Sequence, residues 1–111
     1  MRFAIPLAAG KLTMHFGHCE QFSVIDTKDG AITGEQLLTP PPHEPGVLPN
    51  WIGEEINADI VLAGGMGVKA QKIIADHDVK VIVGCEPKLP RELVADYFAE
   101  TLAAGSNACD H

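Results

Sequence analysis

The sequence predicts a single α/β domain built around one mixed sheet. Residues 2–8 alternate between apolar and other side chains with a period of two, which is typical of a strand. Residues 59–63 form a short, continuous apolar run, as expected of a strand that a parallel sheet buries on both faces. Apolar residues at helical spacing follow over 67–76. A chain of 111 residues suits one domain with one core.

The first half of the chain is expected to form an antiparallel meander. Residues 21–27 and 31–38 are the expected second and third strands, and the Asp29-Gly30 pair between them supplies the positive φ of a tight turn. Pro6 lacks an N–H donor, which predicts a bulge or a partly free edge in the first strand. Residues 39–46 contain four prolines and are expected to form an extended connector.

The second half is expected to alternate helices with strands. Helices are predicted over 47–57, over 67–76 and from Pro90 to a C-cap at Gly105, with strands over 59–63 and 79–83. Right-handed crossovers then give a five-stranded sheet of order 3-2-1-4-5, counting strands along the chain. The predicted domain covers residues 1–105, and a polar C-terminal tail follows at 106–111.

This strand order brings two unusual loops together. The connections after strands 1 and 4 leave in opposite directions, and α/β sheets bind ligands at such a switch point, at the carboxyl ends of their strands. The first loop is Met14-His15-Phe16-Gly17-His18-Cys19, and the second is Gly64-Gly65-Met66-Gly67. We expect the two loops to face each other across one binding cleft.

The first loop carries ligands for soft and borderline metals. Imidazole and thiolate groups suit zinc, copper, iron and metal–sulfide clusters, and His15, His18 and Cys19 could converge within a loop. The alternative is that both histidines are solvated and Cys19 fills a gap in the core. Cys109 and His111 form a second soft-ligand pair on the tail, which could close over the site or remain an uninvolved polar tail.

The second loop has the composition of an anion site. Glycines at a strand-to-helix junction allow close backbone approach, and a helix N-terminus presents free N–H groups. The spacing matches neither a P-loop nor a dinucleotide fingerprint, so an anion without a nucleoside fits better, although a simple tight turn is the alternative. Met66 could add a thioether or pack the helix. Lys11 and Lys69 are the nearby cations.

Composition limits the possible functions. The formal net charge of −7 opposes nucleic-acid binding, because no cluster of Lys and Arg offsets it. No apolar run approaches the roughly 20 residues that span a bilayer. Three cysteines are an odd number for a disulfide framework, so we expect reduced thiols in the cytoplasm. Catalysis has little support, since a two-metal nuclease needs several carboxylates that converge on the sheet, and the predicted strands carry few acids, with Asp26 inside one and Asp59 at the start of another.

Together, His15-Phe16-Gly17 and the later Gly64-Gly65-Met66-Gly67 resemble motifs of the dinitrogenase iron–molybdenum cofactor-binding family. The likeness extends over about residues 1–105 and is greatest to the small single-domain branch that includes the orange protein, a carrier of a molybdenum–copper sulfide cluster. The resemblance implies a ribonuclease H-like, three-layer α/β fold without nuclease activity. It also implies His15 as the cluster contact and Gly64, Gly65 and Gly67 as backbone that forms the cleft.

The leading hypothesis is therefore a non-enzymatic, cytoplasmic carrier or store for an anionic metal–sulfide cluster of the Mo–Cu–S or Fe–Mo–S type. Its partners would be the cluster and proteins that donate or accept it, with no nucleic acid and no membrane. The expected contacts are Lys11, His15, Phe16, Gly17, His18, Cys19, Gly64, Gly65, Met66, Gly67, Cys109 and His111. One alternative is a module that binds a single zinc or copper ion through His and Cys, and a less favoured one is a small-phosphate hydrolase.

Overall fold

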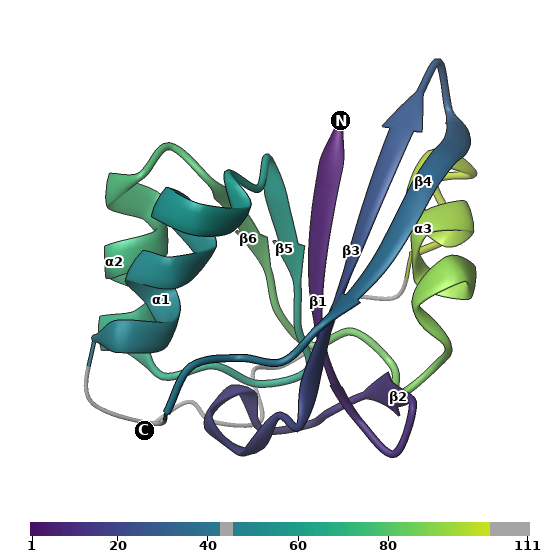
Figure 1. Cartoon of the computed structure of the whole chain (residues 1–111). Helices are drawn as coiled ribbons and strands as arrows, with labels where there is room; N and C mark the ends of the chain where they lie inside the picture. The colour runs from purple at the N-terminus through teal and green to yellow at the C-terminus, as the bar shows by residue number, and fades with distance from the viewer. Residues whose placement is uncertain (43–45, 103–111) are drawn as a thin grey trace.

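The computed structural model describes residues 1–42 and 46–102, which fold into a mixed sheet with helices on both faces (Figure 1). The strands are β1 (Arg2–Ala8), β2 (Lys11–Leu12), β3 (Gln21–Lys28), β4 (Ala31–Leu38), β5 (Ile60–Leu62) and β6 (Lys80–Ile82). The helices are α1 (Val47–Trp51), α2 (Val68–Asp76) and α3 (Pro90–Phe98), with a 3-10 turn η1 (Phe16–His18) and a π-helical turn η2 (Ile52–Ile56). No helix in these two ranges is long and apolar enough to cross a membrane.

The sheet has six strands, not the five expected. Its order is β4-β3-β1-β5-β6, and β2 pairs with the end of β1 beside this path. Ala9 and Gly10 adopt φ of 55° and 82°, which reverses the chain and sets Leu12 opposite Leu7 and Lys11 opposite Ala8. A strand of two residues is too short to produce a period of two, so the alternation pattern could not reveal it.

Side chains alternate between two hydrophobic clusters, one on each face of the sheet. On one face, Ala4, Phe22 and Val61 pack with residues of α1, η2 and α2. On the other, Phe3, Ile25 and Ile60 pack with Leu93 and Val94 of α3. The domain therefore has three layers, with α1 and α2 in one outer layer and α3 in the other (Figure 1).

Three local expectations need correction. The helix expected over 47–57 is a short α1 that loosens into η2 before Asn57 turns at a φ of 54°. The last helix ends at Phe98, because Glu100 has a φ of 61°, and the proposed cap Gly105 lies outside the described residues, as does the tail 106–111. Pro6 causes no bulge, since the β1–β3 register runs through it, but the pairing of β1 with β5 stops at Ala4, which leaves that edge partly free as the other alternative predicted. A register shift occurs instead between Asp26 and Thr27, where β3 meets β4.

Candidate functional site

The loop between β2 and β3 exposes two imidazoles above one buried ring. Phe16 is 5% exposed and packs edge-on against Phe22 of β3, with ring centroids 6.0 Å apart. Phe16 is the first residue of the 3-10 turn η1, and a hydrogen bond of 3.0 Å from the His18 N–H to the His15 carbonyl closes this turn. Side chains three residues apart lie on the same side of such a turn. The His15 and His18 rings are accordingly exposed, with centroids 5.6 Å apart.

Cys19 points the other way. Its side chain is 3% exposed and belongs to the cluster under α1 and α2, because the chain becomes extended at this residue and turns it inward. Loss of solvent raises the pKa of its thiol from 9.0 to about 11, although a backbone hydrogen bond opposes this shift. At neutral pH the group is a protonated thiol. The expected convergence of His15, His18 and Cys19 is therefore not seen, and the part of the chain described here has no group of three metal-ligating side chains.

The His15 loop and the Gly64 loop touch each other directly. The Phe16 N–H donates a hydrogen bond of 2.9 Å to the Gly65 carbonyl. A Cβ atom added at Gly64 would lie 2.8 Å from the Thr13 carbonyl oxygen and 2.9 Å from the Met14 Cα. Glycine at position 64 is thus what allows the two backbones to meet. The loops lie together, as the topology indicates, but they are in contact and do not stand apart as the two walls of a cleft.

The glycine loop is buried at its start and exposed at its end. Gly64 and Gly65 are buried, and Met66 is 0% exposed within the core under α1 and α2. That position indicates that the Met66 side chain packs the core and does not present a thioether to an exposed ligand. Gly67 is exposed and precedes α2, where the first backbone N–H groups have no partner within the helix. The exposed loop end therefore presents N–H groups to solvent.

The two expected cations lie in different places. Lys69 is exposed in the first turn of α2, next to Gly67 and Val68. Lys11 is exposed on β2. The N–H of the next residue, Leu12, donates a hydrogen bond to the Lys88 carbonyl, which holds β2 against the segment that precedes α3. Neither lysine takes part in an ion pair with a described residue.

The family follows from the sequence as a whole. A family model described as "Dinitrogenase iron-molybdenum cofactor" matches residues 1–100. The chain belongs to this family. No curated protein matches it in sequence.

Solved structures share the fold of this family member over nearly its whole length. PH0822 is 25% identical, with a TM-score of 0.86 and 94% of each chain covered. The apo form of the orange protein from Desulfovibrio gigas is 19% identical, with a TM-score of 0.75, and 96% of this chain and 93% of that one are covered. The mj0327 protein of Methanocaldococcus jannaschii is 13% identical, with a TM-score of 0.75 and 96% of each chain covered.

Two features of this family member were not foreseen from its sequence. Met14 is 40% exposed, and its sulfur would lie 3.2 Å from a Cβ at Gly64, so a thioether lies against the glycine loop. Only the contact itself reveals this, because a lone methionine carries no pattern. The second feature is a hollow beside α3, lined by residues from four segments that are distant in sequence. The predicted tail ligands Cys109 and His111 lie outside the described residues.

Proposed function

We propose that this protein carries or stores an anionic metal–sulfide cluster containing molybdenum, of the Mo–Cu or Fe–Mo type, without catalysing a reaction. The membership of the family and the shared fold support a role connected with a metal cofactor. We place this role in the cytoplasm, with proteins that donate or accept the cluster as partners. We also assign the domain to the ribonuclease H-like architecture.

The observation that carries the proposal is the direct contact between the two loops. The hydrogen bond between Phe16 and Gly65 joins the loop that carries the exposed His15 and His18 rings to the glycine loop that leads into α2. Imidazole is a ligand for copper, iron and their clusters. The free N–H groups of α2 and the Lys69 ammonium favour the negative charge of a sulfide cluster. One surface therefore offers a metal ligand and an anion-binding group.

The net negative charge of the protein limits the distance from which an anionic cluster would be attracted to the site. The formal net charge of −7 repels an anion at long range. The helix N-terminus acts only within about its first turn, and Lys69 adds a single positive charge beside it. The cluster would therefore be held by local contacts and not drawn in by the field of the whole protein.

The test is anaerobic purification from the native source, followed by a visible spectrum and by analysis of molybdenum, copper, iron and acid-labile sulfide. We expect intense sulfide-to-metal absorption together with molybdenum. His15→Ala is expected to lose most of this absorption while the far-ultraviolet circular dichroism remains unchanged. His77→Gln is the matched control, because His77 lies at the far end of α2, where its Nε2 contacts the Asn50 side chain at 2.9 Å. Full retention of the cluster by His15→Ala would refute the assigned site.

A second candidate is a site for one zinc or copper ion, favoured by the pairing of His15 and His18. Two imidazoles supply half of a tetrahedral site, and other ligands would have to complete it. Metal stoichiometry separates the two candidates. One metal ion per chain without sulfide would establish this second candidate and refute the carrier.

A further inference from the structure

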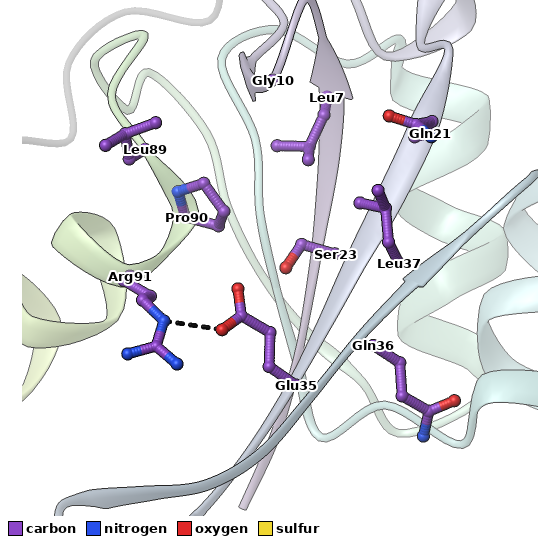
Figure 2. A pocket seen from close by; sticks show the side chains of 10 residues that line it. All are labelled: Leu7, Gly10, Gln21, Ser23, Glu35, Gln36, Leu37, Leu89, Pro90 and Arg91. Atoms are coloured by element: carbon purple, nitrogen blue, oxygen red, sulfur yellow. Dashed lines mark hydrogen bonds and ion pairs between the residues drawn. The ribbon is translucent and has the colours of Figure 1, made fainter.

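A hollow of about 720 Å³ lies on the face of the sheet that carries α3, opposite the face on which Phe16 anchors the His15 loop (Figure 2). This volume is within the range of roughly 300–1,000 Å³ that is typical of small-molecule sites. Its walls come from β1, β3, β4 and the start of α3. The lining residues are Leu7, Gly10, Gln21, Ser23, Glu35, Gln36, Leu37, Leu89, Pro90 and Arg91.

The hollow exists because α3 covers only part of this face. Leu93, Val94 and Tyr97 of α3 pack over Phe3 and its neighbours near the middle of the sheet. The helix begins at Pro90, so the paired positions Ser23 and Leu37 of β3 and β4 have no helix above them. Two leucines at this opening remain unusually exposed, Leu37 by 58% and Leu89 by 49%. A planar apolar group between them would cover surface that is now in water.

The floor of the hollow presents the hydroxyl of Ser23, which has no hydrogen-bond partner among the described residues. Ser23 is 1% exposed, and its hydroxyl forms no hydrogen bond with a described residue. Within the described ranges, every side-chain polar atom that is fully buried has a hydrogen-bond partner. Because the Ser23 hydroxyl has no such partner, it cannot be fully buried, and it must open into the hollow that Ser23 lines. Figure 2 shows this hydroxyl and the Glu35 carboxylate turned toward the same space. A polar group in such a position gains a hydrogen bond if a ligand supplies one.

The charges at the hollow offset each other. Arg91 Nε donates to Glu35 Oε2 at 2.6 Å, which joins α3 to β4 and closes one end (Figure 2). The remaining polar lining residues, Gln21, Ser23 and Gln36, are uncharged, and the Gln36 side chain points away from the hollow (Figure 2). The hollow therefore offers hydrogen-bond donors and acceptors between apolar walls, with no net charge to select an ion. An uncharged ligand avoids the desolvation cost that a charged one would meet here.

We propose that this hollow binds an uncharged planar ring compound that bears an amide-type edge, of about the size of a nucleobase. The ring would lie between Leu37 on one side and Leu89 with Pro90 on the other. Its donor and acceptor edge would meet Ser23 and the Glu35 oxygen that Arg91 does not occupy. This site is separate from the loops of the proposed cluster site, so neither proposal depends on the other.

The test is a titration of the full chain followed by two-dimensional proton–nitrogen NMR. Nicotinamide and nicotinate have the same ring and differ in charge, and hypoxanthine adds a larger uncharged ring. We expect nicotinamide and hypoxanthine to shift the amide signals of residues 21–23 and 35–37 and of Leu89 and Arg91, and nicotinate to bind at least fivefold more weakly than nicotinamide. Equal or tighter binding of nicotinate would refute an uncharged ligand. An absence of shifts with millimolar nicotinamide and hypoxanthine would refute the site.

Variants distinguish the hollow from unspecific association. Ser23→Ala is expected to weaken nicotinamide binding about fivefold, the usual effect of one lost hydrogen bond. Leu37→Gln, at an exposed position that tolerates substitution, should weaken it by a similar factor. Glu54→Gln is the control, because Glu54 is exposed on η2, on the opposite face of the sheet. Unchanged affinity in both Ser23→Ala and Leu37→Gln would overturn the proposal.

Discussion

His18 and Cys19 are neighbours in the chain but lie in opposite environments. The His18 ring is in solvent, whereas the Cys19 side chain packs beneath α1 and α2. From the sequence alone, Cys19 could be either a metal ligand or a thiol buried in the core. Burial favours the core thiol, because soft metals bind the thiolate and burial disfavours that form.

The raised pKa of Cys19 makes a prediction about pH. A group whose pKa is 9.0 when unfolded and about 11 when folded keeps its proton longer in the folded state. The free energy of unfolding should therefore fall as the pH rises from about 9 to about 11, and be unaffected by this group below pH 9. Urea denaturation at pH 8 and pH 10 measures the fall. Cys19→Ala should show a smaller fall than the parent protein, and an identical fall would show that burial does not control this thiol.

Gly64 offers a second prediction at the residue scale. A methyl group at this position meets the Thr13 carbonyl at 2.8 Å, so Gly64→Ala must push the two loops apart. We expect a loss of about 1–3 kcal/mol in the free energy of unfolding, as is usual for overpacking. Gly17→Ala is the matched control in the other loop, because its Cβ would have no heavy atom within 4 Å. Urea denaturation should separate the two variants, and equal losses would show that the contact is not tight.

At the scale of elements, the packing of η2 on α2 depends on one glycine. A Cβ at Gly53 would overlap the ring of His77, the residue that ends α2. The same ring contacts the Asn50 side chain, so it joins α1 to the end of α2. The π-helical turn η2 (Ile52–Ile56) contains Gly53, the residue against which the His77 ring packs. π-Helical turns are rare, and helical periodicity alone predicts an ordinary helix here.

This contact can be tested by a double-mutant cycle. Gly53→Ala should lower the free energy of unfolding by about 1–3 kcal/mol through overlap with His77. In a His77→Ala background the same substitution should cost much less, giving a coupling of at least about 1 kcal/mol. Chemical denaturation of the four proteins measures it. Strictly additive losses would mean that the two side chains do not meet.

At the scale of the whole molecule, period-two alternation was enough to locate β1, and short apolar runs were enough to locate β5 and β6, because each pattern reflects burial on one or both faces. The alternation of Phe3 and Ala4 between two clusters is an example. Features that depend on contacts between distant segments could not be found in this way. The tight approach at Gly64, the inward turn of Cys19 and the hollow beside α3 all arise from tertiary packing. The sequence could therefore predict which residues occupy the loops but not which of them face solvent.

The charge of the whole molecule gives the last prediction. An anionic probe such as tetrathiomolybdate should first meet the field of a chain with a formal charge of −7, and only near α2 meet Lys69 and the free N–H groups. Salt shortens the Debye length from about 30 Å at 0.01 M to about 8 Å at 0.15 M, which removes the long-range repulsion first. The association rate should therefore rise with salt over this range, as stopped-flow absorbance would show. Lys69→Gln should weaken binding at every salt concentration.

Lys72→Gln is the matched control for this experiment, since it removes the same charge from an exposed position one turn further along α2. Lys72 is further than Lys69 from the start of α2, where the anion is expected to bind, so it should contribute less. If both variants weakened binding equally, the probe would be responding to net charge and not to the start of α2. An association rate that fell with salt would mean that local attraction exceeds the repulsion of the whole chain, and the capture of the anion would then begin at long range.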